Sequence, residues 1–193
     1  MAKAKSIDKQ ASSDSGAIRY AAFLRGINVG GHRKIKMTDL ARMFSAMGLA
    51  DVRTWIASGN VVFSSDVANE ADLTKLIERA LEQELGYPVD VMLRRVVWLQ
   101  ELIERDPFAS VTGEEGHRYV SFMQSAPKET PDLPYDAPDE YYSVLAMHDR
   151  DVFWLSRKMP NGRHGDSGKF ISKHVGKVAT VRNWNTVVKI AEM

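Results

Sequence analysis

The apolar residues between Ile18 and Arg95 change their spacing from that of a strand to that of a helix and back, which leaves few folds open. The clearest segment is a helix that Asn69 can cap and that Gly86 and Pro88 end. Apolar residues three or four positions apart predict its buried face: Leu73, Leu76, Ile77, Ala80, Leu81 and Leu85. This segment is therefore predicted to be an amphipathic helix with one face in the core.

Four short segments with the alternation typical of strands accompany this helix. They cover residues 19–24, 52–56, 61–63 and 89–93, with a shorter amphipathic helix over residues 40–47. Ser58-Gly59-Asn60 is interpreted as a hairpin turn, because the glycine that a G-x-S-x-G nucleophile motif needs before the serine is missing. The βαββαβ order over residues 18–95 predicts a ferredoxin-like lobe whose helices share one sheet face. The other face must be covered or used.

The remaining half predicts a similar but less regular lobe, residues 96–193. It contains a helix, a strand, a proline-rich connection, a hairpin, a helix, a strand and a last helix, at residues 97–105, 119–123, 125–138, 142–155, 169–175, 179–181 and from about 185. This order resembles the first lobe with its first helix lost. The predicted fold class is therefore α+β, with two ferredoxin-like lobes packed together, the second degenerate. Residues 1–17 are polar and predict a disordered tail.

Composition excludes several classes of chemistry. The chain has no cysteine, which removes disulfides, thiolate nucleophiles and iron–sulfur clusters. Its five histidines show no metal-ligand spacing, so neither a metal site nor a cofactor is expected. No apolar run is long enough to cross a bilayer, and residues 1–16 have no apolar segment typical of a signal peptide. We therefore expect a cytoplasmic protein without membrane association.

Charge is distributed unevenly along a chain whose formal net charge is +1. Residues 101–151 carry twelve acidic and four basic side chains, whereas residues 152–193 carry eight basic and two acidic ones. A basic C-terminal surface could meet an anion. Alternatively, the two oppositely charged surfaces are simply solvated and balance each other within the fold. The sequence leaves both interpretations open.

The connection between the first strand and the first helix is long, glycine-rich and basic. Successive glycines allow backbone N–H groups to converge on an anion, and nearby cations can add charge. The candidate binding residues of this loop are Arg25, Gly26, Asn28, Gly30, Gly31, Lys34 and Lys36. The spacing matches neither the dinucleotide-binding G-x-G-x-x-G motif nor a P-loop. The alternative is that the glycines only allow a tight loop.

A second unusual cluster begins the last helix. Its candidate binding residues combine a planar cation, two amides and an indole: Arg182, Asn183, Trp184 and Asn185. Such groups can stack on a base and form hydrogen bonds with a base or a sugar. The alternative is structural, with an asparagine capping the helix and Trp184 anchoring it in the core. Asp149-Arg150-Asp151 is interpreted as a charged hairpin turn.

Three phrases of the sequence resemble the bacterial domain of unknown function 1697 family. They are FLRGINVGG at residues 23–31, WIASGNVVF at 55–63 and TVRNWNT at 180–186. The resemblance implies a compact protein of two ferredoxin-like lobes. It implies no activity, because none is established for the family. Beyond the candidates already named, the family's signature positions include Ser58, Gly59, Asn60 and Thr186.

The leading hypothesis is a protein that binds a phosphate-bearing ligand, a nucleotide or a short nucleic acid, through the glycine-rich loop and the RNWNT segment. One alternative is an enzyme acting on a small anionic metabolite, for which His32 is the nearest acid–base candidate in the sequence. Another is a protein-interaction module that uses an open sheet face. Both clusters follow strands, so Arg25, Asn28, Arg182 and Asn185 would surround one cleft if the two strand ends face each other. The catalytic residues, if any, and the oligomeric state stay open.

Overall fold

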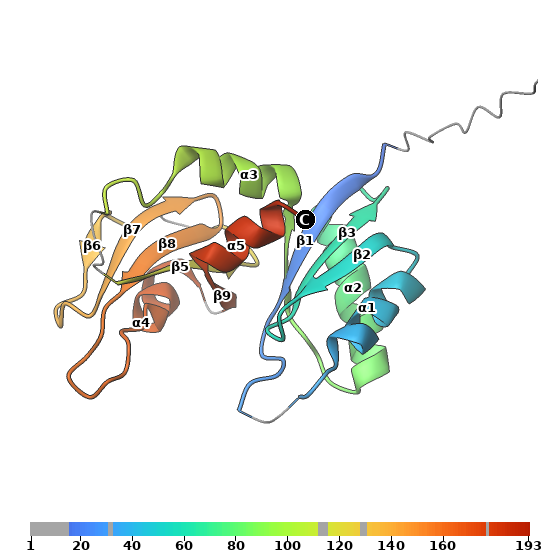
Figure 1. Cartoon of the computed structure of the whole chain (residues 1–193), viewed down its shortest axis with the longest axis horizontal. Helices are drawn as coiled ribbons and strands as arrows, with labels where there is room; N and C mark the ends of the chain where they lie inside the picture. Colours follow the sequence, from blue (N-terminus) through green and yellow to red (C-terminus); the bar gives the residue numbers. More distant parts are fainter. Residues whose placement is uncertain (1–15, 31–32, 112–115, 128–130, 177) are drawn as a thin grey trace, which may run out of the picture.

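The computed structural model describes residues 16–30, 33–111, 116–127, 131–176 and 178–193. Two lobes lie side by side, each built on an antiparallel sheet (Figure 1). The predicted α+β fold of two packed lobes is confirmed. Apart from residues 16 and 17, the predicted tail lies outside the described residues. Among the helices of the described residues, none combines the length and the apolar character needed to cross a membrane.

The first lobe has the predicted βαββαβ order. Its sheet is β2-β3-β1-β4, with every neighbouring pair antiparallel. The elements are β1 (Ile18–Leu24), α1 (Met37–Ala46), β2 (Ala50–Trp55), β3 (Asn60–Ser65), α2 (Glu70–Leu85) and β4 (Val91–Arg95). The Asn69 side chain accepts hydrogen bonds from the amides of Ala71 and Asp72, so the predicted cap of α2 is confirmed. One detail of β2 was wrong, because Ile56 lies beyond the strand with a φ of 48° and is exposed.

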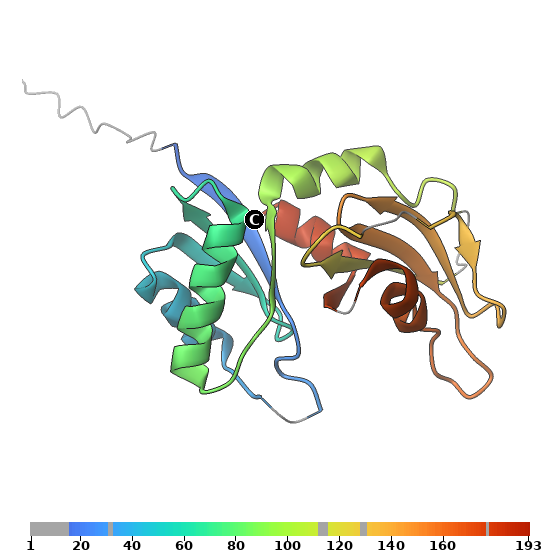
Figure 2. The same cartoon turned by 180° about the vertical axis from the view of Figure 1, so that it is seen from behind.

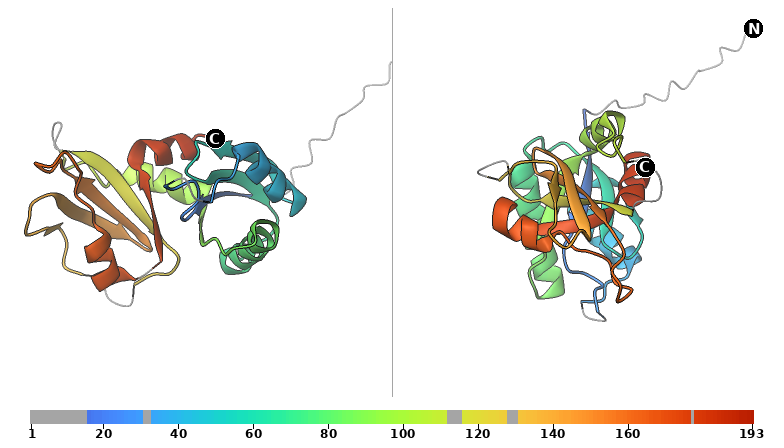
Figure 3. Two further views of the ribbon diagram at one scale, coloured as in Figure 1. Left: turned by 90° about the horizontal axis from the view of Figure 1, so that it is seen from below. Right: turned by 90° about the vertical axis from the view of Figure 1, so that its left-hand side faces the viewer.

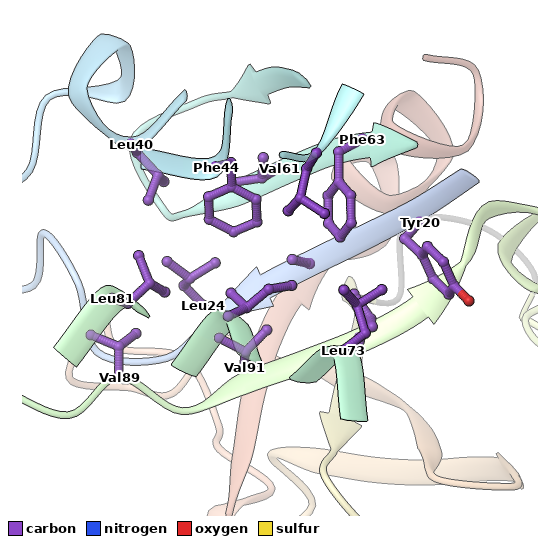
Figure 4. Packing of buried hydrophobic residues seen from close by; sticks show 14 of the residues in the cluster. Tyr20, Leu24, Leu40, Phe44, Val61, Phe63, Leu73, Leu81, Val89 and Val91 are labelled. Carbon is purple, nitrogen blue, oxygen red and sulfur yellow. The ribbon is translucent and has the colours of Figure 1, made fainter. Parts of the chain in front are cut away.

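One face of this sheet packs against both helices. Tyr20, Ala22 and Leu24 of β1 meet the buried faces of α1 and α2 in a continuous apolar core (Figure 4). Phe44 of α1 stacks at an angle on Phe63 of β3, with 5.5 Å between ring centroids. These residues alternate along β1 with others that point to the opposite face, as the two-residue period of a strand requires.

The second lobe repeats this topology with one change. Its sheet is β6-β7-β8-β5-β9, and without β6 the order corresponds to that of the first sheet. The connection that carries β6 stands where the first lobe has its first helix, as predicted. The elements are α3 (Val96–Arg105), β5 (His117–Met123), β6 (Tyr135–Asp136), β7 (Tyr142–His148), β8 (Asp151–Ser156), α4 (Gly168–Phe170), the π-helical turn η1 (Ile171–Val175), β9 (Ala179–Asn183) and α5 (Trp184–Ala191).

The lobes share a second apolar core. Phe23 of β1 points away from α1 and α2 and stacks on Phe122 of β5, with ring centroids 4.0 Å apart and planes 10° from parallel. Helices α3 and α5 complete this core: they pack against each other, and α3 runs from the first lobe over the second sheet (Figures 2 and 3). The face of the first sheet that the sequence left open is thus covered by the second lobe.

The two lobes are equivalent residue by residue around this core. The segments RYAAFL in β1 and RYVSFM in β5 occupy the same strand positions, so Phe23 stacks on its own counterpart. Phe23 pairs with Asn60 across its sheet, and Phe122 pairs with Asp151. Each final strand is followed directly by a helix, α3 after β4 and α5 after β9. The repeat therefore groups α3 with the first sheet.

Candidate functional site

The glycine-rich loop after β1 is built from left-handed turns. Gly26, Asn28 and Gly30 have φ values of 69°, 54° and 59°, a region that glycine enters without strain and asparagine tolerates. Gly31 and His32, the other residues of interest here, lie outside the described residues. At Gly26 and Gly30 the backbone conformation therefore favours glycine.

Asn28 holds the loop in shape from inside. Its amide nitrogen donates to the carbonyls of Ile35 and Ala57 at 3.1 and 2.7 Å, and its side-chain oxygen accepts from the Ile35 amide at 2.8 Å. The contact to Ala57 ties the loop to the turn between β2 and β3. Asn28 is therefore a brace between two loops.

A pocket of about 1000 Å³ opens between this loop and the start of α1. Lys34 and Lys36 are exposed at its margin, and Arg42 projects from α1 into the same lining. The rest of the wall has an apolar part, formed by Ile35, Met37, Met43, Ala57 and Leu85, and a polar part, formed by Asn28, Thr38 and the acidic Asp39. The pocket thus combines basic groups with an apolar surface.

The first turn of α1 adds backbone donors to this pocket. Lys36 occupies the N-cap position without a capping side-chain hydrogen bond, and the Asp39 and Leu40 amides bond to its carbonyl. The amides of Met37 and Thr38 have no hydrogen-bond partner within the described part of the chain, and both residues line the pocket. Such amides at a helix N-terminus favour anions.

Arg25 stands apart from the pocket lining. Its side chain pairs with Asp90 at 2.9 Å, and both side chains are close to half exposed. An ion pair in this setting is screened by water and contributes little to stability. Among the four residues expected to surround one cleft, only Asn28 lines this pocket.

The RNWNT segment is structural at its centre. β9 is two residues longer than predicted and ends at Asn183, so α5 begins at Trp184. The Asn183 side chain accepts a hydrogen bond from the Asn185 amide at 3.0 Å, which caps the helix. Trp184 is 7% exposed and packs against Phe108 and Phe153. The capping and anchoring alternative is therefore confirmed for Asn183 and Trp184, while Asn185 is exposed on the first turn.

Arg182 crosses from the second lobe into the first. Its guanidinium donates to the Asn60 side chain and to the carbonyls of Leu24, Ser58 and Gly59. It also donates to the Thr180 hydroxyl and the Val181 carbonyl. Burial lowers the pKa of Arg182 to about 10, so the side chain stays cationic at neutral pH. Arg182 thus supports the base of the glycine-rich loop and has no donor left for a ligand.

A matching arginine that sequence reasoning missed crosses in the opposite direction. Arg94 of β4 donates to Asp151 through Nε and through a terminal nitrogen at 2.9 and 2.7 Å, and also bonds to the Met123 carbonyl. Asp151 accepts a further hydrogen bond from the Trp98 indole. The hairpin interpretation of Asp149-Arg150-Asp151 is confirmed, yet Asp151 is fully buried. The sequence pattern RYxxF occurs at residues 19–23 and again at 118–122. This repeat could have revealed that Arg94 and Arg182 occupy equivalent positions in the two lobes.

The comparisons with known proteins identify a family. The family described as "Protein of unknown function (DUF1697)" matches residues 18–153, more than two thirds of the chain. The chain belongs to this family. The match contains the glycine-rich loop and ends before the TVRNWNT phrase at residues 180–186.

The solved structures add a likeness of fold to DUF1697 membership. The conserved bacterial protein SP0830 from Streptococcus pneumoniae superposes with a TM-score of 0.68 at 22% identity, over 92% of this chain and 98% of that one. At this identity the likeness concerns the fold alone. No curated protein matches the sequence significantly.

Replacing Asn28 tests its role as a brace within this DUF1697 loop. Asn28→Asp keeps the acceptor for the Ile35 amide but removes both donors, and is expected to lower the free energy of unfolding by about 1–2 kcal/mol. Amide hydrogen exchange at residues 33–36 should accelerate in the same variant. Asn161→Asp is a matched control because, in the part of the chain that the structure describes, the Asn161 side chain accepts from the Arg163 amide and donates to nothing. Unchanged exchange in the loop would show that Asn28 does not brace it.

Proposed function

We propose that this protein binds a phosphate-bearing ligand of nucleotide size in the pocket between the glycine-rich loop and α1. The observation that carries the proposal is that three cations, Lys34, Lys36 and Arg42, line one pocket with the start of α1, against a single carboxylate, Asp39, among the described lining residues. The first amides of α1, which have no partner in the described part of the chain, add to this preference for an anion. Flexible lysines and a helix N-terminus are a common combination around phosphate groups. A cytoplasmic location, where nucleotides are abundant, is part of the same proposal.

The apolar wall favours a nucleotide over inorganic phosphate. Ile35, Met37, Met43 and Leu85 offer a surface on which a base or another flat apolar group can rest. A pocket of about 1000 Å³ has room for a mononucleotide or for the end of a short single strand. In this proposal Arg182 acts through the loop that it supports, and Asn183 and Trp184 only position α5.

A thermal-shift panel tests the proposal directly. A ligand that binds only the folded protein raises its melting temperature, so ATP, AMP, pyrophosphate, phosphate and a short oligonucleotide are compared at equal concentration. Among the small molecules, ATP is expected to raise the melting temperature most and inorganic phosphate least. If no phosphate-bearing probe shifts the transition or binds in calorimetry, the proposed function is wrong.

Removing the two pocket lysines is expected to weaken this binding. The Lys34→Ala and Lys36→Ala double variant should raise the Kd for ATP by about tenfold at 50 mM salt, since exposed cations near a phosphate contribute through a screened Coulomb attraction. The dependence of Kd on salt should also become flatter. Lys169→Ala with Lys173→Ala is the control, because it removes equal charge from exposed residues of the second lobe. Equal losses in both double variants would indicate a general charge effect.

A further inference from the structure

The two crossing arginines differ in one respect, the charge of their partner. Arg94 and Arg182 are both the fourth residue of a five-residue final strand, and each pairs with the same position of the first strand, Ala21 and Val120 respectively. Each donates to the carbonyl that ends the first strand of the other lobe. Their partners also occupy equivalent positions, the first residue of β3 and of β8. In one lobe that partner is Asp151, and in the other it is Asn60.

This difference leaves one buried cation neutralised and the other not. Arg94 forms a buried ion pair with Asp151. Arg182 is 6% exposed, and within the described residues it has no carboxylate within 4.0 Å. Its hydrogen bonds to carbonyls and amides satisfy its donors but do not cancel its charge. A buried charge surrounded by protein is screened less than one in water, so its field extends to nearby surfaces.

The surface next to Arg182 is the proposed anion pocket. Arg182 bonds to the Ser58 carbonyl, and the adjoining residue, Ala57, lines the pocket. The Ala57 carbonyl in turn accepts from Asn28, which lines the pocket as well. The guanidinium is therefore connected to the pocket wall through the neighbouring turn residues Ser58 and Ala57. The Arg94 and Asp151 pair has no such contact with this wall, since its bonds go to Leu93, Met123, Arg150 and Trp98.

We propose that Arg182 is a positioning residue whose uncancelled charge strengthens anion binding in the pocket, and that a neutral asparagine at position 60 preserves this charge. The inference rests on the proposed function, because it concerns the same pocket. It also narrows the ligand class. A fixed buried cation behind the wall favours ligands with several phosphate charges, such as a nucleoside triphosphate, over those with one phosphate.

Asn60→Asp tests the charge without removing the arginine. The variant places in the first lobe the carboxylate that Asp151 supplies in the second. It also loses the bonds from the Asn60 amide to the Trp55 carbonyl and the Ser58 hydroxyl, at 2.9 and 3.0 Å. Asn60→Ala loses the same two bonds and adds no charge, although it also removes the acceptor for Arg182 Nε, so it serves as the uncharged control. Both are compared with the parent chain by calorimetry with ATP and with AMP.

The expected result depends on ligand charge. Relative to Asn60→Ala, Asn60→Asp should weaken ATP binding by about five- to tenfold and AMP binding by about twofold, because the lost attraction scales with phosphate charge. A purely structural role would weaken both ligands by the same factor. Equal ATP affinities in the two variants, or equal factors for ATP and AMP, would overturn the inference. Failure of the parent chain to bind any phosphate-bearing probe would instead reject the proposed function itself.

A second pair of variants covers the case in which Asn60→Asp does not fold. Arg182→Lys and Arg182→Gln both lose the guanidinium with its five N–H donors, but only the lysine retains the charge. Measured below their melting temperatures, Arg182→Lys should bind ATP about fivefold more tightly than Arg182→Gln. Equal affinities in this pair would also overturn the inference.

Discussion

The Asp151→Asn variant is expected to unfold with a free energy about 3–5 kcal/mol lower than that of the parent chain, because it leaves the Arg94 cation buried without a counter-charge. Both side chains are almost inaccessible, at 1% and 0% exposure, so water cannot replace the lost partner. The Asn oxygen can still accept both bonds from Arg94, which reach one oxygen of Asp151. The amide nitrogen that replaces the other oxygen cannot accept the bond from Trp98, and the negative charge is lost. For a chain of this length, the melting temperature should fall by roughly 10 °C.

Urea denaturation monitored by tryptophan fluorescence measures this loss. Asp149→Asn is the control, because it lies in the same hairpin turn, also faces an arginine, and is 52% exposed. A surface pair of this kind should contribute at most about 0.5 kcal/mol. If Asp151→Asn costs no more than Asp149→Asn, the two lobes are not joined by a buried ion pair.

Most of the first lobe could be predicted from local sequence patterns. The helix after Asn69 has a capping residue, an apolar stripe and a terminating glycine, and all three act within a single segment. The hairpin at Ser58-Gly59-Asn60 also depends on local backbone chemistry, since Gly59 adopts a φ of 77°. A Cβ at Gly59 would lie 2.5 Å from the Ile27 side chain, a contact that the sequence could not reveal. Local patterns thus predict the helices, strands and turns, whereas the contacts between them depend on tertiary packing.

The limits of sequence reasoning are clearest at the interface between the lobes. Asp151 follows two charged residues in a hairpin, a pattern that is usually solvated, and its burial depends on Arg94 from another lobe. The predicted strand over residues 179–181 stops short of the polar Arg182 and Asn183, which belong to β9. A strand residue that faces a second lobe need not be apolar when its polar atoms are all bonded. Polar residues at an interface within one chain have no local signature.

The candidate pocket could be predicted only in part. Lys34 and Lys36 belong to a conspicuous loop, and they line the pocket. Arg42 and Leu85 come from two helices, and they reach the pocket only because α1 begins beside the end of α2. The RNWNT segment looked like a binding motif because its residue types suit a base. The same residue types also suit a helix cap and a buried anchor, which is where the structure places Asn183 and Trp184.

Arg182→Met is expected to lower the free energy of unfolding by about 3–4 kcal/mol, since it leaves several buried acceptors unsatisfied at once. These acceptors include the carbonyls of Leu24 and Ser58 and the side chain of Asn60. The control is Arg163→Met, on an exposed loop, which should change stability by less than about 0.5 kcal/mol.

The equivalence of the two lobes also sets an order between this variant and its counterpart. Arg94→Met should cost more than Arg182→Met, by about 1 kcal/mol or more, because it strands the buried carboxylate of Asp151, whereas Arg182→Met leaves only neutral groups behind. Adding Asp151→Asn to Arg94→Met should recover part of the loss, and adding Asn60→Ala to Arg182→Met should recover less, as a double-mutant cycle on each pair would show. Equal costs for the two arginine variants would mean that the charge at Asp151 is not what distinguishes the two lobes. The opposite order would mean that Arg182, despite its neutral partner, holds the lobes together more strongly than the buried ion pair does.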